Sequence, residues 1–163
     1  MRVLKLCLLL AVAFGLSACA NKFRTYNGPA VTQIYIDKSE RRMLLLHDRT
    51  VLEAYDIDLG FAPVGPKQFE GDGRTPEGGY LISHRNPDSA YHLSIGISYP
   101  NDADRAFAAA ANQPTGGDIF IHGRNKQDGG RSDWTAGCIS VKDREIEDIY
   151  AMVRDGTPIW IAP

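Results

Sequence analysis

The feature that most constrains the fold is a series of short segments in which apolar and polar residues alternate, each bounded by charged or turn-forming residues. Apolar and polar residues partly alternate from Val31 to Ile36, a charged cluster follows, and the apolar run Met43 to Leu46 comes next. A side-chain period of two residues is that of a half-buried strand, so these segments predict a β-hairpin. Further strands are predicted at residues 51–59, 79–83, 91–97, 118–122 and 158–162.

Helical patterns are confined to two segments. Residues 102–112 are rich in alanine, and residues 142–154 carry Ile146, Ile149 and Val153 at helical spacing. Many short strands with two helices predict a mainly β fold, a sandwich or partly open barrel with the helices packed on its outside. A chain of 163 residues has the length of a single domain of this kind.

Composition and spacing argue against several classes of function. The chain has 18 basic and 20 acidic residues and a formal net charge of -2, whereas nucleic-acid-binding domains carry basic patches. The Gly-rich segment 71–79 lacks the lysine-serine or lysine-threonine ending of a P-loop, and we interpret it as a turn between strands. The histidines and Cys138 lack the paired spacing of structural zinc ligands, so we expect no metal site and no cofactor.

The N-terminal residues carry the parts of a secretory signal. A basic start is followed by the apolar run Leu6 to Leu16, which is too short to span a bilayer as a mature helix. The next residues, Leu16-Ser17-Ala18-Cys19, resemble a bacterial lipobox, whose cysteine is acylated and becomes the new N-terminus. The alternative is an ordinary signal peptide with a chance cysteine. We therefore predict a lipoprotein signal peptide at 1–18, a lipidated N-terminus and polar tether at 19–29, and one domain at 30–163.

Lipidation of Cys19 would place the domain in the periplasm, held on a membrane, because two or more acyl chains suffice for stable anchoring. In enterobacterial lipoproteins, an aspartate directly after the lipidated cysteine is linked to retention in the inner membrane. This chain has Ala20 at that position, so the resemblance to these lipoproteins favours the outer membrane. Cys7 leaves with the signal and Cys19 is used by the lipid. Cys138 then remains as a thiol in an oxidising compartment, which makes it a candidate reactive residue.

The segment around Cys138 carries the pattern of a thiol enzyme. A short apolar strand ends in His122-Gly123, and Cys138 follows sixteen residues after the histidine, within Thr135-Ala136-Gly137-Cys138. A thiol needs a neighbouring base to become the attacking thiolate, and histidine is a common partner. Gly137 lets the backbone approach a substrate carbonyl, so the amides of Gly137 and Cys138 are a candidate oxyanion hole. The alternatives are a buried core cysteine and a hydrogen-bonded histidine at a strand end.

These motifs resemble the L,D-transpeptidase (YkuD-type) family. The family is marked by a histidine-glycine pair, a loop of about this length and a Ser/Thr-x-Gly-Cys turn, and its Gly-rich Thr-Pro-x-Gly segment is similar to residues 71–80. The resemblance covers roughly residues 30–163. It implies a YkuD-type β-rich fold, with Cys138 as the nucleophile and His122 as its base. The implied substrates are peptidoglycan stem peptides, with a wall-attached lipoprotein as a further candidate partner.

Other residues near the two motifs complete the predicted site. Gly123 joins Gly137 as a backbone component. The candidate contacts to an acidic, carboxylate-bearing peptide are Arg124, Arg131, Trp134 and Thr135, although solvated loop charges explain the arginines equally well. His84 and His92 have no partner motif and are interpreted as surface or hydrogen-bonded residues.

Two positions depart from the family pattern. Ala136 stands where most relatives have a second histidine, and Ser140 stands where many have an arginine. The turn is instead similar to the YafK-type branch, one member of which is associated with hydrolysing cell-wall linkages. The direction of the reaction is therefore open between L,D-transpeptidation through a thioester and hydrolysis of peptidoglycan–lipoprotein or L,D linkages. A non-catalytic envelope module that binds peptidoglycan is the alternative from another class.

Overall fold

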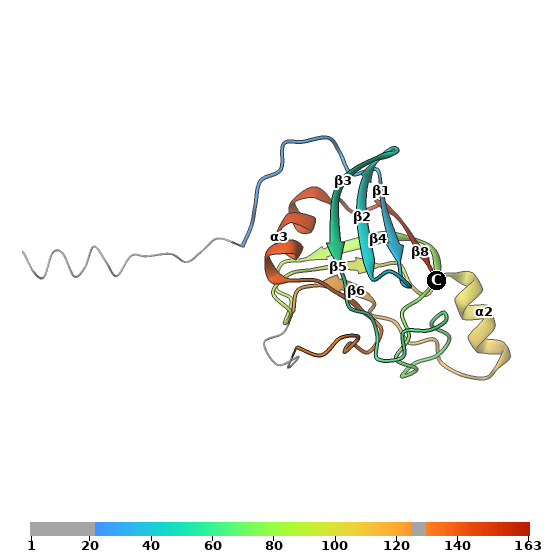
Figure 1. Ribbon diagram of the computed structural model, residues 1–163. Coiled ribbons are helices and arrows are strands. Elements are labelled where there is room, and N and C mark those ends of the chain that lie inside the picture. The colour runs from blue at the N-terminus through green and yellow to red at the C-terminus, as the bar shows by residue number, and fades with distance from the viewer. Residues whose placement is uncertain (1–21, 125–129) are drawn as a thin grey trace, which may run out of the picture.

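The computed structural model describes residues 22–124 and 130–163, and strands dominate them (Figure 1). The predicted signal peptide and Cys19 lie outside these residues. In chain order the elements are β1 (Gln33–Asp37), β2 (Arg42–His47), β3 (Thr50–Asp56), β4 (Gly78–Asn86), β5 (Ser94–Ile97), α2 (Asp102–Ala110), β6 (Phe120–His122), β7 (Ile139–Ser140), α3 (Asp143–Met152) and β8 (Pro158–Ala162). Within the described residues, no helix is long and apolar enough to cross a membrane.

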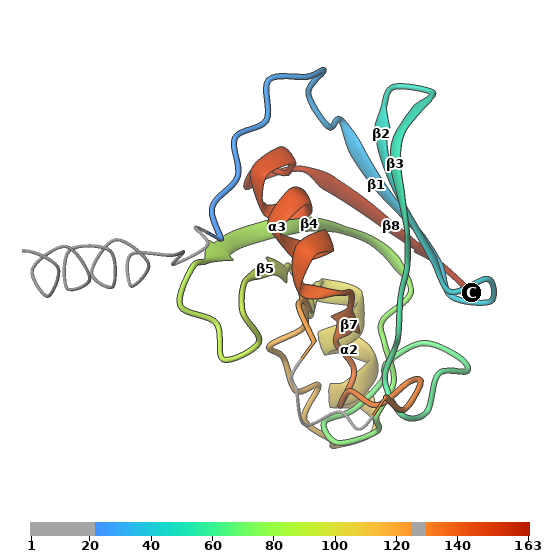
Figure 2. The same ribbon diagram turned by 60° about the vertical axis from the view of Figure 1, so that its left-hand side comes forward.

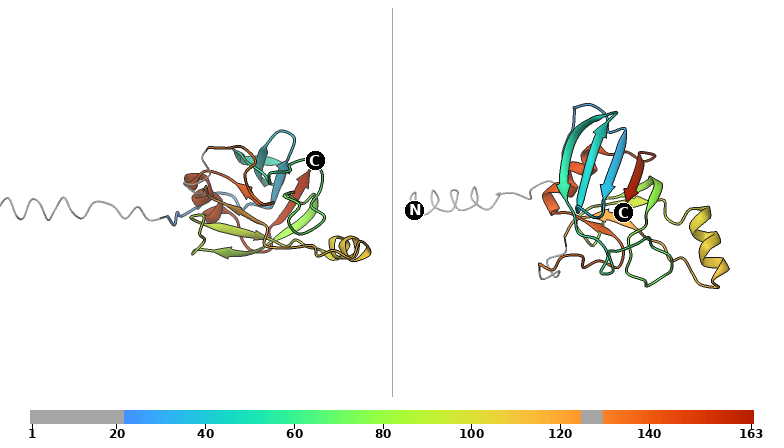
Figure 3. Two further views of the ribbon diagram at one scale, coloured as in Figure 1. Left: turned by 90° about the horizontal axis from the view of Figure 1, so that it is seen from below. Right: turned by 45° about the vertical axis from the view of Figure 1, so that its right-hand side comes forward.

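The strands form a single sheet in the order β3-β2-β1-β8-β4-β5-β6-β7. The predicted hairpin is present, because β1 and β2 pair antiparallel with Ile34 opposite Leu45. The C-terminal strand β8 lies between β1, to which it is parallel, and β4, to which it is antiparallel. Figure 3 shows β3, β2, β1 and β8 side by side in its right-hand view. The last pair, β6 and β7, is parallel again.

The sheet curls at β4, which belongs to both of its halves. The first half of β4 pairs with β8 and the second half pairs with β5, with a register shift between Ile82 and His84. A shift of this kind bends a strand and increases its twist. Figure 2 shows α3 in the angle between the two halves. The apolar residues of α3 are buried there. The predicted mainly β domain with two helices is confirmed as a curled eight-stranded sheet.

The two helices play different parts. In α3, Ile146 and Ile149 are fully buried, as expected from their helical spacing. In α2, only Ala108 is buried and Phe107 stays exposed, and the helix stands at the periphery (Figure 1). Asn101 caps α2 by accepting a hydrogen bond from the Asp104 amide, while Asp104 accepts one from the Asn101 amide. Capping of this kind lets a short alanine-rich helix form without a large packed face.

The sequence pattern missed β7 and extended β5 too far. β7 contains two residues, Ile139 and Ser140, and is a strand only because β6 lies beside it. Residues 91–93 were predicted as strand, but they form part of the connection from β4 to β5. There the Leu93 amide donates to the Tyr91 carbonyl at 3.0 Å, which closes a local turn.

The described part of the predicted tether contacts the domain. The Lys22 ammonium donates to the carbonyls of Pro87 and His92, at 2.6 and 3.1 Å. Arg24 forms ion pairs with Glu147 and Asp148 on α3. The segment from Lys22 therefore packs along the surface near α3 and the β4–β5 connection.

A buried lysine ties the end of β1 to the Gly-rich segment. The Lys38 side chain is 3% exposed, and its ammonium contacts the carbonyls of Gly65 and Thr75 and, at 2.6 Å, the Glu77 carboxylate. Burial lowers the pKa of Lys38, against the raising effect of the Glu77 bond. A buried charge of this kind is tolerated only with its partners in place.

We predict that Lys38→Met destabilises the domain, because it leaves Glu77 and two carbonyls without their cationic partner. The free energy of unfolding should fall by about 3 kcal/mol. Urea unfolding followed by circular dichroism would measure the change. Lys142→Met is the matched control, since Lys142 pairs with Glu145 at an exposed position, and it should cost less than about 1 kcal/mol. Equal losses in the two variants would contradict the assigned role of Lys38.

Candidate active site

Pairing of β6 with β7 brings His122 and Cys138 to one pocket. His122 ends β6, and Cys138 immediately precedes β7, whose residue Ser140 lies opposite His122 in the parallel register. Both side chains line a pocket of about 270 Å³. The wall of this pocket is otherwise formed by Asn86, Ser89, Ala90, Tyr91, Ser94, Asp118 and Phe120. Two residues sixteen positions apart in the sequence are thus neighbours through one strand pair.

The imidazole of His122 is oriented by the residue that follows it. The side chain is buried, and its Nδ1 lies 2.6 Å from the Gly123 carbonyl oxygen. A carbonyl accepts hydrogen bonds only, so Nδ1 carries the proton and Nε2 has the free lone pair of a base. Burial lowers the pKa of His122, against the raising effect of the Gly123 bond. The residue is therefore neutral at pH 7.

The thiol of Cys138 is half-buried and also neutral at rest. Burial raises the pKa of Cys138, and the negative charge of Asp118 raises it further. A hydrogen bond from the Phe120 backbone and the positive charge of Lys67 act in the opposite direction. The Sγ atom donates a weak hydrogen bond of 3.5 Å to the Asp118 carbonyl. A base must therefore remove the proton when the thiol reacts.

Two aromatic rings hold the His122 imidazole. The Tyr91 ring packs against it with a centroid distance of 4.4 Å and an interplanar angle of 32°. The Trp134 ring meets it edge-on, with centroids 5.8 Å apart. The indole N–H of Trp134 donates to the buried Ser140 hydroxyl at 3.1 Å. Ser140, at a position where the family pattern has an arginine, therefore fixes the ring that faces the histidine.

The turn before Cys138 is closed by Thr135. The Thr135 hydroxyl donates to the Cys138 carbonyl at 2.7 Å and accepts from the Gly137 amide at 3.1 Å. The Gly137 amide, predicted to face the substrate, is thus used inside the turn. The Gly123 amide is used as well, since it donates to the carbonyls of Tyr91 and Leu93. Of the two amides predicted for the oxyanion hole, the Cys138 amide is the one left for that role.

The turn before Cys138 packs closely against the backbone of two other segments. A Cβ atom on Gly60 would come within 2.1 Å of the Gly73 carbonyl oxygen and 3.0 Å of the Gly137 Cα. A Cβ on Gly137 would lie 2.7 Å from the Arg74 carbonyl oxygen, and the φ of Gly137 is +133°. Only glycine fits these contacts. The Gly-rich segment that the sequence presented as a turn between strands therefore also forms the floor under the Cys138 turn.

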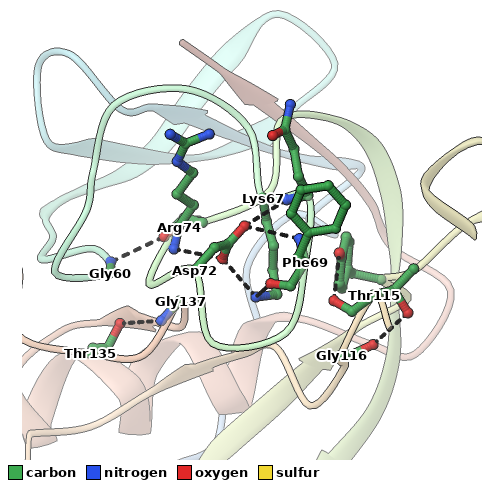
Figure 4. Close-up of polar contacts among 12 residues, drawn as sticks. Gly60, Lys67, Phe69, Asp72, Arg74, Thr115, Gly116, Thr135 and Gly137 are labelled. Carbon is green, nitrogen blue, oxygen red and sulfur yellow. Dashed lines mark hydrogen bonds and ion pairs between the residues drawn. The ribbon is translucent and has the colours of Figure 1, made fainter. Parts of the chain in front are cut away.

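Asp72 holds together the Gly-rich segment that packs under the Cys138 turn. Its carboxylate accepts hydrogen bonds from the amides of Gln68, Phe69 and Arg74 and pairs with the Lys67 ammonium at 2.9 Å (Figure 4). Although burial acts to raise the pKa of Asp72, the three amides and Lys67 outweigh it and the pKa is lowered. The Asp72 carboxylate therefore stays charged and holds the buried Lys67 ammonium in place. The positive charge of Lys67 in turn acts to lower the pKa of Cys138.

The loop residues predicted to contact substrate have mixed surroundings. Arg124 is ion-paired with Asp58, which lies beside β7, and Thr135 is buried within the turn. Arg131 is exposed at the surface, and the residue of this loop that forms an ion pair with another part of the chain is Asp133. Asp133 binds Arg41 at 2.7 Å and accepts a hydrogen bond from the Leu59 amide. Trp134 packs on His122, as described above.

The sequence did not predict that the β4–β5 connection forms one wall of the pocket that holds His122 and Cys138. Ser89, Ala90 and Tyr91 line the pocket, and Tyr91 touches the histidine, yet no motif marks them. The segment lies about thirty residues before His122 and reaches it only because β5 pairs with β6. His92 and His84 do not line the pocket: His92 bonds to Glu147, and His84 packs on Phe120.

Comparison with known proteins identifies the domain type. The family model of the L,D-transpeptidase catalytic domain, YkuD, matches residues 32–161. Over 138 residues the chain is 30% identical to YafK of Escherichia coli (strain K12), a protein named as an L,D-transpeptidase; the match covers 81% of this chain and 50% of YafK. The chain thus spans about half the length of the curated relatives it matches.

Solved structures share the curled sheet. A variant of the helical cell shape determining protein Pgp2 from Campylobacter jejuni superposes with a TM-score of 0.62 at 25% identity, covering 86% of this chain and 50% of that one. Bd1075 of Bdellovibrio bacteriovorus gives 0.59 at 23% identity, over 82% and 48%. An L,D-transpeptidase from Mycobacterium smegmatis gives 0.56 at 15% identity, over 82% and 59%.

We predict that Asp118→Asn makes the Cys138 thiol more acidic. The Asp118 carboxylate raises the pKa of Cys138, so removing its charge should lower that pKa. The rate of alkylation by iodoacetamide, followed at Cys138 by peptide mass across a pH series, measures it. The asparagine keeps the backbone carbonyl that accepts from Sγ.

Asp155→Asn is the matched control, because Asp155 is exposed and is not among the charges that act on Cys138. Its alkylation profile should coincide with that of the unmodified chain. The assigned influence of Asp118 would be refuted by a profile that stays in place, or moves to higher pH, in Asp118→Asn.

Proposed function

We propose that this chain, which belongs to the YkuD family of L,D-transpeptidase catalytic domains, is a cysteine-dependent acyl-transfer enzyme acting on peptidoglycan stem peptides. The observation that carries the proposal is the shared pocket of Cys138 and an imidazole whose Nδ1–H is bound to the Gly123 carbonyl. This bond leaves Nε2 to act as the base. No cofactor is required.

In the first half of the reaction, Nε2 of His122 takes the proton of Cys138 and the thiolate attacks a peptide carbonyl carbon. The Cys138 amide stabilises the oxyanion of the tetrahedral intermediate. The intermediate collapses to a thioester, the C–N bond breaks, and the leaving amine takes the proton from the imidazolium. Tyr91 and Trp134 keep the ring in place during both proton transfers.

In the second half, a nucleophile resolves the thioester. An acceptor amine loses its proton to His122 and forms a new amide bond, which gives a cross-link or attachment to a wall-bound lipoprotein. Water in the same position gives hydrolysis. In both cases the proton returns to the Cys138 sulfur and the free enzyme is restored.

The balance between transfer and hydrolysis depends on how firmly the acceptor is held. Transfer wins over water when the amine is held near the thioester, an effect that can reach about 10⁵ M in effective concentration. Ser140 is fully buried and bound to Trp134, so it offers no group to the acceptor, and Ala136 offers only a methyl group. We therefore propose that hydrolysis of the same linkages competes strongly with transfer.

A lipid on Cys19 would hold the domain directly at a membrane surface. The lipobox-like sequence Leu16-Ser17-Ala18-Cys19 supports anchoring, and Lys22 already contacts the domain. Three residues span at most about 11 Å when fully extended. We propose a periplasmic, lipid-anchored protein, on the outer membrane rather than the inner, whose catalytic domain lies close to the lipid.

We predict that the enzyme converts a stem-peptide donor to two products in the presence of excess acceptor amine. Mass spectrometry over a time course should find hydrolysed donor in amounts comparable to cross-linked product at acceptor levels near those in the envelope. Cys138→Ala should form neither product, while its unfolding transition stays close to that of the unmodified chain. Predominantly cross-linked product would refute the hydrolytic leaning, and turnover in Cys138→Ala would refute the nucleophile.

His122→Gln tests the base in the same assay. The variant should lose roughly 10² to 10⁴ in kcat, the usual contribution of a positioned base. In the unmodified enzyme kcat/KM should fall as pH drops through the lowered pKa of His122, so the acid limb lies below pH 6.5. That limb should be absent from the variant. A non-catalytic binding module would show no turnover and no acyl adduct on folded Cys138 with a carbapenem-like reagent.

The anchor gives a separate prediction. Mass analysis of the protein extracted from membranes should find an N-terminus at Cys19 that carries acyl chains, and Cys19→Ala should release the domain from the membrane fraction. An unmodified Cys19, or a soluble protein that begins at another residue, would contradict the anchor without affecting the catalytic proposal.

A further inference from the structure

The connection between β4 and β5, residues 87–93, forms one wall of the candidate active site, and we call it the pocket loop. Ser89, Ala90 and Tyr91 line the pocket. The Tyr91 ring stacks on the His122 imidazole, and the Tyr91 carbonyl accepts the Gly123 amide at 3.1 Å. The conformation of this loop therefore affects both the space for substrate and the surroundings of the catalytic base.

Lys22 bonds to both ends of the pocket loop. Its ammonium donates to the Pro87 carbonyl at 2.6 Å and to the His92 carbonyl at 3.1 Å, across 65 and 70 residues of sequence. These bonds differ from an ordinary surface ion pair, since both acceptors are backbone carbonyls and the lysine is half-buried. A charged donor makes stronger hydrogen bonds than a neutral one. One side chain thus fixes the distance between the two ends of the loop.

A second set of contacts holds the same segment in place. Arg24 pairs with Glu147 at 2.8 Å and with Asp148 at 2.6 Å, and the other Glu147 oxygen lies 2.8 Å from Nε2 of His92. Although burial acts to raise the pKa of Glu147, the bonds from His92 and Arg24 outweigh it and the pKa is lowered. Glu147 on α3 is therefore charged, and it connects the N-terminal segment to the pocket loop.

The backbone of the loop needs such restraint. His92 has a φ of +72°, a left-handed conformation that a non-glycine residue keeps only when its surroundings impose it. The carbonyl of His92 is held by Lys22, and its side chain is held by Glu147. With these bonds removed, His92 can relax, and Tyr91, its neighbour, moves with it.

We propose that Lys22 is a positioning residue of the active site, which keeps the pocket loop closed against His122. The expected change in KM rests on the proposed function, whereas the expected change in the hydrogen exchange of the pocket loop does not. The segment that leads from the predicted anchor then supports the pocket wall through its bonds to Pro87 and His92. The domain beginning at residue 30 would then have the catalytic pair without a fully ordered pocket wall.

The test compares the full chain with three variants. Lys22→Met keeps the aliphatic stem and removes the donors, and Lys22→Arg restores donors. Lys142→Met is the control, because it removes an exposed lysine whose ion-pair partner is Glu145. Hydrogen–deuterium exchange read by mass reports on residues 87–93 and, as an internal reference, on α3 and β1. Steady-state kinetics with a stem-peptide donor report KM and kcat.

In Lys22→Met we expect exchange at residues 87–93 to become about ten-fold faster while β1 is unchanged. KM for the donor should rise roughly three- to ten-fold with kcat within two-fold, since only the closed fraction of the loop binds well. Lys22→Arg should recover most of both, and Lys142→Met should match the unmodified chain. Unchanged loop exchange in Lys22→Met, or an equal increase in every segment, would overturn the proposal.

Absence of turnover in all four proteins would overturn the proposed function, and the hydrogen exchange of the pocket loop would still decide the role of Lys22.

Discussion

The pairing of two very short strands is the interaction on which the site depends. β7 contains two residues, and its parallel contact with β6 is what brings Cys138 beside His122. Two residues of pairing are a weak attachment by themselves. The strand is held from its other side by Asp58, whose amide and carbonyl both bond to Ser140, and by the bridge from Gly60 to Thr135. The segment 58–60 thus fixes the turn that carries Cys138 through two isolated bridges.

This arrangement leaves both His122 and Cys138 uncharged in the protein without substrate. Burial lowers the pKa of His122 and raises that of Cys138, so a stable thiolate–imidazolium pair is disfavoured at rest. The thiol is protected from adventitious oxidation in that form, because the thiolate is the reactive species. In the proposed reaction, proton transfer is coupled instead to attack on the substrate. The Nδ1 bond to Gly123 and the two aromatic rings keep Nε2 available for that transfer.

The sequence predicts the parts of this protein that local pattern encodes. Alternation in β1 and β2 and the spacing of Ile146 and Ile149 gave the hairpin and α3 at nearly their observed bounds. The histidine–cysteine motif indicated the two residues that share the pocket. β7, Tyr91 and Asp133 escaped prediction because each acts through a partner distant in sequence: β6, His122 and Arg41. The oxyanion prediction included the Gly137 amide because nothing in the sequence shows that the Thr135 hydroxyl takes it.

Ser140, which stands where the family pattern has an arginine, serves the internal order of this site. An arginine there would project a charge that needs a carboxylate partner, whereas serine is small enough to be fully buried at the end of β7. Its hydroxyl accepts the Trp134 N–H, and that ring borders the imidazole. The Ser140 hydroxyl thereby has a hydrogen-bond partner within the protein, and the bond restrains the Trp134 ring that packs on His122. In the proposed function, contacts to substrate would then come from other residues that line the pocket, among them those of the pocket loop, Asn86 and Asp118.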